Sequence, residues 1–214
     1  MDKEIRRKGF AEEEEDEVEE VKFSEGKPFV SGFRGGGGFT AGFSGAVTVD
    51  LGALDLSADW VTLSSKFVGK NEGFAQKATW DVNAYRLGFG SDKIIGADGK
   101  IRDVVVGDVT SVDAALKMLQ YELSVSYKSR LVGTGATKIS EATFNSLNNK
   151  QKAALISYVY NVGSLRPGIA EAIRNGNLAS AAQQIQAGPV TAGGQTLAGL
   201  VRRRAEEATL FSSA

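Results

Sequence analysis

The side chains that could do chemistry in this chain are carboxylates, Lys, Arg, Tyr, Ser and Thr, because its 214 residues include no His and no Cys. This composition excludes Ser-His-Asp and Cys-His catalysis, and it excludes metal sites built on imidazole or thiolate ligands. It also excludes disulfides. We therefore expect neither a metal nor another cofactor, and the carboxylates become the candidates for catalysis.

Glu72 and Asp81 are the carboxylates whose surroundings best suit acid–base chemistry. Glu72 precedes apolar residues at helical spacing (Phe74, Ala75 and Ala78), and this spacing predicts a helix that ends near Asp81. Hydrolysis of a glycosidic bond needs one carboxyl group kept neutral by an apolar setting and a second one that stays ionised. Spacing alone favours a simpler interpretation, in which Glu72 is a helix-start carboxylate facing the helix dipole.

The segment after these carboxylates predicts a small β lobe followed by a long helix. Residues 84–109 alternate short apolar runs with Gly and Asp, and the Ala-Asp-Gly at 97–99 is typical of a hairpin turn. We expect two or three short antiparallel strands there. Thr110 and Asp113 fit a capping box, and the apolar spacing that follows predicts a helix to about Arg130.

The C-terminal part of the chain has the pattern of a helical cluster. Apolar spacing and Gly or Pro punctuation predict helices over 140–147, 149–162, Pro167 to Gly176, 178–187 and 195–211. Within this cluster we expect Val159, Tyr160 and Val162 to be packing residues, and Arg202, Arg203 and Arg204 to form a solvated face. A small β piece, a long helix and a helical bundle predict an α+β domain with two lobes.

Three motifs in this chain occur together in a known enzyme family. They are a Glu-Gly pair at 72–73 with Asp81 and the Gly-Phe-Gly at 88–90, then ALISYVYNVGS at 154–164, then LAGLVRRRAEEATLF at 197–211. In type and order they resemble the motifs of the phage-type muramidases, the T4-lysozyme-like enzymes of glycoside hydrolase family 24. The resemblance implies a lysozyme-like α+β fold with a small antiparallel β lobe, a long connecting helix and a helical C-terminal lobe.

The same resemblance implies a function and a site. The substrate would be bacterial peptidoglycan, cleaved at the β-1,4 bond between N-acetylmuramic acid (MurNAc) and N-acetylglucosamine (GlcNAc). Glu72 would be the general acid and Asp81 the second carboxylate. Tyr85, Ser91 and Asn161 would bind substrate, and Asn161 falls in the lobe that supports the cleft.

Two positions depart from the family pattern. Arg86 stands where the family usually has a Thr that helps to hold the attacking water, and Ser91 stands where it often has His. A guanidinium cannot accept a hydrogen bond, so Arg86 would pair with Asp81 and hinder its use as a base, or stabilise charge on a sugar substituent. Three outcomes stay open: a muramidase that uses water differently, a lytic transglycosylase, or an inert lysozyme fold used as an adaptor.

The N-terminal part differs in composition from the rest. Residues 1–20 hold ten acidic and four basic residues, and residues 31–46 are rich in Gly and Phe. We expect residues 1–65 to be an extension that acts as a linker or docks on other phage proteins, with the catalytic domain over 66–214. Within it, alternation at Val47, Val49 and Leu51 gives a weak strand signal.

Charge and hydropathy exclude other classes of function. The formal net charge of −1 argues against a nucleic-acid binder, and no apolar run is long enough for a membrane span or a signal anchor. The extension favours a virion-associated enzyme that opens peptidoglycan during genome delivery. The alternative is an endolysin that waits in the host cytoplasm for a holin-type pore.

Overall fold

The computed structural model describes residues 46–81 and 83–213, and they all belong to one compact unit of the chain. The acidic stretch at 11–20 and all but the last residue of the Gly- and Phe-rich stretch lie outside the described residues. The linker and docking hypotheses for this extension therefore stay predictions.

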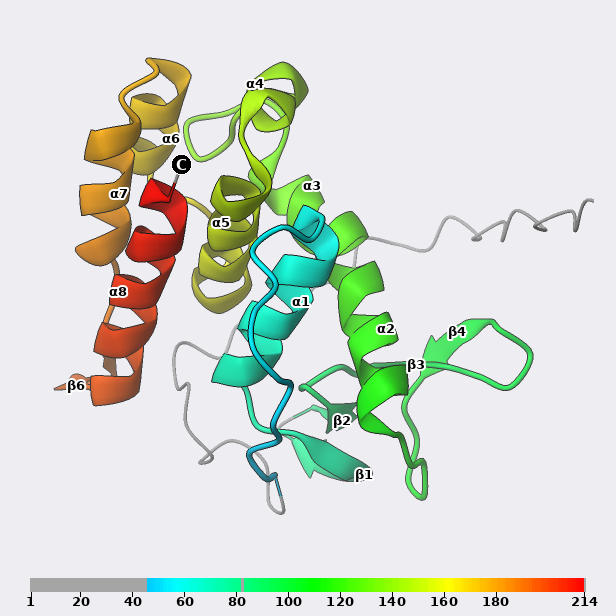
Figure 1. Cartoon of the computed structure of the whole chain (residues 1–214). Helices are drawn as coiled ribbons and strands as arrows, with labels where there is room; N and C mark the ends of the chain where they lie inside the picture. The colour runs from blue at the N-terminus through cyan, green and yellow to red at the C-terminus, as the bar shows by residue number, and fades with distance from the viewer. Residues whose placement is uncertain (1–45, 82, 214) are drawn as a thin grey trace, which may run out of the picture. The chain divides into compact units, whose positions relative to one another are not determined.

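The described chain alternates a few short strands with helices (Figure 1). In order, the elements are α1 (Trp60–Asn71), β1 (Ala75–Asp81), β2 (Ala84–Gly88), β3 (Lys93–Ile95), β4 (Ile101–Asp103), α2 (Val112–Glu122), α3 (Lys128–Leu131), α4 (Glu141–Ser146), α5 (Asn149–Val162), α6 (Pro167–Arg174), α7 (Leu178–Gln186), β5 (Thr191–Ala192), β6 (Gln195–Thr196) and α8 (Ala198–Ser212). The hairpins β1–β2 and β3–β4 are antiparallel, and α5 packs against both α1 and α8. The predicted lysozyme-like α+β architecture is confirmed.

The first helix of the domain was not predicted. Asp59 caps α1, because its side chain accepts hydrogen bonds from the backbone N–H groups of Val61 and Thr62. The apolar face of α1 is buried against α5 and α2. The strand signal near Val47 was wrong, since the structure has only a single bridge there, between Val47 and Phe74. Because α1 runs across residues 65 and 66, the boundary expected there passes through a helix.

The helix predicted after Glu72 was also wrong, because residues 75–81 form strand β1. This strand pairs with β2, and its register shifts between Ala75 and Thr79. Such an irregularity bends a strand locally. Two alanines and one Phe at helical spacing are a weak helix signal, and pairing with the adjacent strand β2 overrides it.

The rest of the β lobe and the long helix follow the sequence closely. The turn at 97–99 joins β3 to β4, as predicted. The N-cap of α2 is Ser111 rather than Thr110, since the Ser111 hydroxyl accepts from the backbone N–H of Ala114. A π-helical turn over Leu123–Tyr127 joins α2 to α3, so the helical path continues to Leu131.

The C-terminal lobe is organised around α5. This helix has a capping box at Asn148 and Gln151, and it ends at Gly163, whose φ of 94° is left-handed backbone that favours glycine. Val159 is buried, as predicted, while Tyr160 and Val162 are half-buried. Among the helices of the described residues, none combines the length and hydropathy needed to cross a membrane.

Candidate active site

Glu72 lies at the C-terminal end of α1, where the helix meets the β lobe. It is the C-cap of α1, and its backbone N–H donates to the carbonyl oxygens of Val68 and Gly69. The interpretation of Glu72 as a helix-start carboxylate is therefore wrong. Its Oε1 accepts a hydrogen bond of 2.6 Å from Nη1 of Arg203 on α8, and 22% of its side chain stays exposed.

The electrostatic setting of Glu72 contains two opposing effects. Burial raises the pKa of the carboxyl group above its usual value, because removal from water penalises the charged form. The nearby Arg203 guanidinium acts in the opposite direction but does not cancel the effect of burial. The result is a partly accessible carboxyl group that holds its proton to a higher pH than an exposed glutamate.

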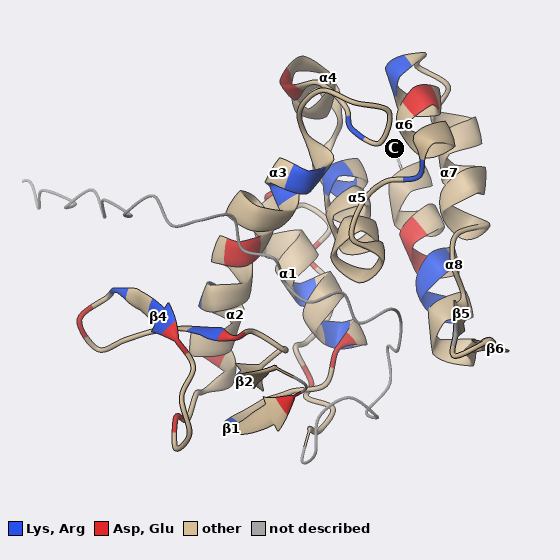
Figure 2. Ribbon diagram, turned by 180° about the vertical axis from the view of Figure 1, so that it is seen from behind, with Lys and Arg blue, Asp and Glu red and all other residues tan. Residues whose placement is uncertain are grey.

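Arg203 belongs to a buried ionic cluster, not to the solvated face that its sequence context suggested. Arg203, Arg204 and Glu207 are all fully buried, whereas Arg202 is exposed. Arg203 Nε lies 3.2 Å from Glu207 Oε1, which also accepts from the Ser157 hydroxyl at 2.7 Å. Figure 2 shows acidic and basic segments next to each other along α8. The cluster fixes the guanidinium that contacts Glu72.

The cluster extends from Arg203 to Asn161. Arg204 Nη1 lies 2.6 Å from Glu207 Oε2, close enough for an ion pair although the two atoms are not aligned as a hydrogen bond. Nη2 of Arg204 donates to Oδ1 of Asn161 at the end of α5. Asn161 is therefore linked to Glu72 through the buried side chains of Arg204, Glu207 and Arg203. This chain of contacts fixes the end of α5 relative to Glu72.

Asp81 and Arg86 meet across the β1–β2 hairpin, as the sequence suggested. Arg86 Nε lies 3.5 Å from Asp81 Oδ2, and only 12% and 15% of the two side chains are exposed. Arg86 also donates from Nη1 to the carbonyl oxygen of Gly90 at 3.3 Å. Arg86 thus ties Asp81 to the turn that follows β2.

The other predicted substrate-binding residues have local partners. Tyr85 packs edge-on against Trp80, with ring centroids 5.2 Å apart, and Trp80 is 61% exposed. The Ser91 hydroxyl is 2.6 Å from Oε1 of the buried Glu122 on α2. Tyr85 therefore stands beside an exposed aromatic surface, whereas Ser91 turns toward the helix that backs the β lobe.

Sequence reasoning missed Arg203 and Glu207, which contact Glu72 directly or through one another, and it missed Glu122, the partner of Ser91. Arg203 and Glu207 are four residues apart on α8, a spacing that brings two helical side chains together. That spacing within the Arg-Arg-x-x-Glu motif was the available signal. Glu122 had no comparable signal, because its partner Ser91 lies 31 positions away in the sequence.

No metal site is present among the residues that the structure describes, where acidic side chains do not gather in groups of three or more around one point.

The backbone conformation of the Gly-Phe-Gly turn has a clear steric cause. Gly88 has a φ of +62°, and a Cβ there would lie 2.8 Å from the Cβ of Ala115 on α2. Only glycine allows β2 to approach α2 this closely.

Comparison with known proteins shows to which protein family this chain belongs. The sequence model of the family described as phage lysozyme matches residues 69–207. No curated protein matches the chain. Among solved structures, a mutant of P22 lysozyme shares 21% identity with a TM-score of 0.52, covering 70% of this chain and 95% of its own.

Two further structures are similar at a lower TM-score of 0.49. The endolysin from Escherichia coli O157:H7 phage FAHEc1 shares 23% identity over 75% of this chain and 95% of its own. The muramidase domain of SpmX from Asticaccaulis excentricus shares 22% identity over 71% of this chain and 95% of its own.

The matched region runs from within α1 into α8, and it includes Glu72, Asp81 and the buried cluster up to Glu207. The P22 lysozyme likeness agrees with the fold described above. The chain therefore belongs to the phage lysozyme family and is a glycoside hydrolase of the lysozyme type.

Proposed function

We propose that this protein cleaves the β-1,4 bond between MurNAc and GlcNAc in peptidoglycan, with Glu72 as general acid. The observation that carries the proposal is the setting of Glu72: burial raises its pKa, one edge stays accessible, and Arg203 holds it at 2.6 Å. A carboxyl group whose pKa is raised keeps its proton to a higher pH, and it can then protonate a leaving group. Membership of the phage lysozyme family supports the same reaction.

Two proton transfers accompany the cleavage itself. The proton of the Glu72 carboxyl group passes to the glycosidic oxygen as the bond from that oxygen to C1 breaks, and the electron pair stays on the oxygen. A water molecule then bonds to C1, and its proton passes to Asp81. Asp81 afterwards releases this proton to solvent and Glu72 takes one up from solvent, so the net change is one water added across the bond. Clearing of a peptidoglycan gel by the purified full chain tests the proposal, and a folded chain that clears nothing contradicts it.

The ion pair between Arg86 and Asp81 favours a second candidate reaction. Arg86 Nε lies 3.5 Å from Asp81 Oδ2. The guanidinium therefore hinders this carboxylate in binding and activating a water molecule. Without an activated water, the MurNAc 6-hydroxyl could attack C1 instead and close an internal anhydro ring, its proton passing to the Glu72 carboxylate left by the first step. This second candidate is a lytic transglycosylase that uses the same acid, Glu72.

Replacing Arg86 with Thr tests which reaction operates. Removal of the cation ends its ion pair with Asp81, so we expect hydrated products to form faster by about tenfold, a part of the 10²–10⁴-fold that a general base contributes. Mass spectrometry distinguishes hydrated fragments from anhydro fragments, which are lighter by one water. Arg102→Thr, which removes an ion pair with Asp108 on the β3–β4 side, is the control. If wild type releases only anhydro ends, the hydrolytic proposal fails and the transglycosylase replaces it.

We also propose that the enzyme is carried in the phage particle and acts on the cell wall during genome delivery. The support is the N-terminal sequence, with its acidic head and its Phe residues among glycines, which the catalytic reaction does not need. Such a segment could dock on a phage structural protein. The alternative, an endolysin released through a holin-type pore, needs no such attachment.

Deletion of residues 1–45 is expected to abolish incorporation into particles while leaving hydrolysis unchanged. The deletion ends before Val47, whose backbone pairs with Phe74, and before the buried face of α1. Phage particles that encode the deletion variant can be purified, and mass spectrometry then measures how much of the truncated protein they contain. Particles that keep the truncated chain at the wild-type level would contradict the docking hypothesis.

A further inference from the structure

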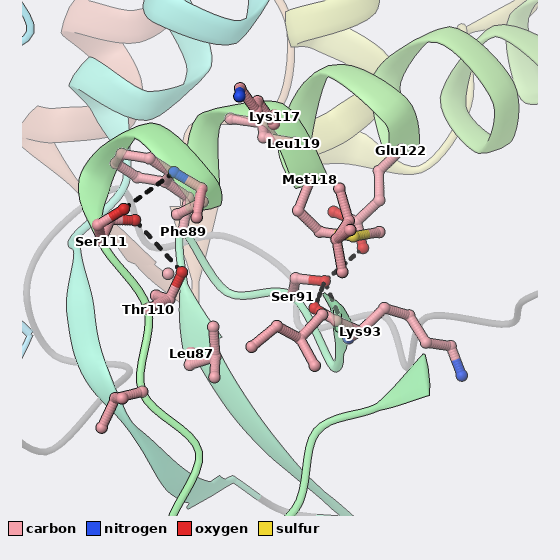
Figure 3. Close-up of a pocket in the computed structure, with 16 residues that line it drawn as sticks. Leu87, Phe89, Ser91, Lys93, Thr110, Ser111, Lys117, Met118, Leu119 and Glu122 are labelled. Carbon is pink, nitrogen blue, oxygen red and sulfur yellow. Dashed lines mark hydrogen bonds between the residues drawn. The ribbon is translucent and has the colours of Figure 1, made fainter. Parts of the chain in front are cut away.

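A cavity lies behind the β lobe, between α2 and the segments β2 and β3 (Figure 3). Its volume is about 250 Å³, and Glu72, Asp81 and Arg86 do not line it. Most of its lining is apolar and comes from the turn after β2, from β3 and from α2. The larger apolar side chains in its wall include Leu87, Phe89, Ile94, Ile95, Met118 and Leu119.

One end of this cavity is formed by a buried carboxyl group. Glu122 is 7% exposed, and its Oε1 hydrogen-bonds to the Ser91 hydroxyl at 2.6 Å. Among the described residues, no hydrogen-bond donor reaches Oε2 and no cation forms an ion pair with Glu122. A carboxyl group this buried usually has a cation or a full set of hydrogen bonds. The open oxygen lies in a cavity with room for a ligand.

The charges around Glu122 favour a cationic ligand. Asp92 raises the pKa of Glu122, Arg86 and Lys93 lower it, and Tyr160 on α5 also interacts with it. Arg86 and Lys93 are themselves paired with Asp81 and Asp103, so these two cations are shared with other carboxylates.

Two lysines line the cavity, but among the described residues neither forms an ion pair with the Glu122 carboxyl group. In Figure 3 the side chains of Lys93 and Lys117 extend away from Glu122 in different directions. The interior therefore has a carboxyl group without a cation of its own. An apolar body with one positive end complements such a cavity.

We propose that this cavity binds a primary ammonium group on a short alkyl chain, with the ammonium on Glu122 and the chain along the apolar wall. Ser91 keeps the carboxyl group oriented, and Met118 contacts the alkyl chain. A free alkylamine and a lysine-type side chain of a peptide share this chemistry. The proposal does not depend on the enzymatic activity, because binding can be measured without it.

The chain offers a direct reporter for binding. It contains two methionines, Met1 and Met118, and Met118 is the one that lines the cavity among the described residues. In the full chain labelled with ¹³C at the methionine methyl groups, with the Met118 signal assigned by a Met118→Leu variant, titration with pentylammonium is expected to shift the Met118 signal. At pH 8 we expect pentylammonium to bind at least about tenfold more tightly than its neutral analogue pentanol.

The pH dependence of binding tests the role of the carboxyl group. Burial raises the pKa of Glu122 to about 7. An alkylammonium keeps its charge at pH 6 and pH 8, whereas Glu122 changes from mostly neutral to mostly ionised, so binding should tighten about tenfold between these pH values. Glu122→Gln should bind pentylammonium and pentanol equally at both pH values. Glu141→Gln, on the exposed α4 pair with Lys128, should behave as wild type.

A pocket-filling variant keeps the test valid if Glu122→Gln does not fold. Ala114 is an exposed residue of α2 in the cavity wall, and Ala114→Trp should abolish the Met118 shift without removing any charge. Binding of Nα-acetyl-lysine amide would identify peptide side chains as ligands, and binding of pentylammonium alone would identify free amines. The proposal is overturned if pentylammonium does not shift Met118, or if pentanol binds as tightly.

Discussion

Replacing Glu72 with Gln is expected to lower the rate of peptidoglycan cleavage by about 10²–10⁴-fold, the usual contribution of a general acid. Gln keeps an oxygen for the hydrogen bond from Arg203 but has no proton to give to the glycosidic oxygen. The fold should therefore survive the change. Release of soluble fragments from purified peptidoglycan measures the loss.

The matched control for this prediction is Glu206→Gln. Glu206 is a glutamate on α8 whose side chain forms a 3.4 Å surface pair with Lys70 instead of joining the buried cluster. We expect this variant to keep the wild-type rate. In wild type the rate should fall as pH rises through the pKa of Glu72, because the acid must be protonated to act, and burial places that pKa above the usual value. A Glu72→Gln variant with more than a tenth of wild-type activity would contradict the assignment.

Replacing Glu207 with Gln is expected to have the largest effect on stability. This carboxylate is fully buried and lies within 3.2 Å of both Arg203 and Arg204. Loss of the negative charge leaves the guanidinium groups of Arg203 and Arg204 next to a neutral amide. Breaking a buried ion pair in this way lowers the free energy of unfolding by about 3–5 kcal/mol. The melting temperature should fall by at least about 6 °C for a chain of this size.

The neighbouring residue again provides the comparison. Glu206→Gln removes the same charge one position earlier on α8, but from an exposed pair, so the free energy of unfolding should change by less than about 1 kcal/mol. Thermal denaturation of the two variants under one set of conditions gives the difference directly. Equal melting temperatures would show that the buried cluster does not hold α8 against Glu72.

The helices were predictable where local signals and packing agree. The predicted helix over 149–162 matches α5, because Asn148 and Gln151 form its capping box and Gly163 ends it. The segment after Glu72 was not predictable in this way. Its apolar residues suit a helix and a strand equally, and the choice depends on pairing with β2, which single-sequence spacing does not contain.

Part of the candidate site could be read from the sequence. The motif resemblance pointed to Glu72 and Asp81 as candidates, and reasoning about charge anticipated the pair between Asp81 and Arg86, which the structure shows. The burial of Arg203 and Arg204 was missed, because three consecutive arginines usually lie in solvent and only tertiary packing brings Glu72 and Asn161 to them. The cavity at Glu122 depends on contacts between distant segments, and no local pattern predicts it.

The most direct test of Glu72-dependent hydrolysis is digestion of purified peptidoglycan by the full chain in water enriched in ¹⁸O, followed by mass spectrometry of the fragments. We predict fragments whose new MurNAc reducing ends each carry one ¹⁸O atom, and no such fragments with Glu72→Gln. Release of unlabelled anhydro ends, or the absence of fragments from a correctly folded wild-type chain, would contradict the account.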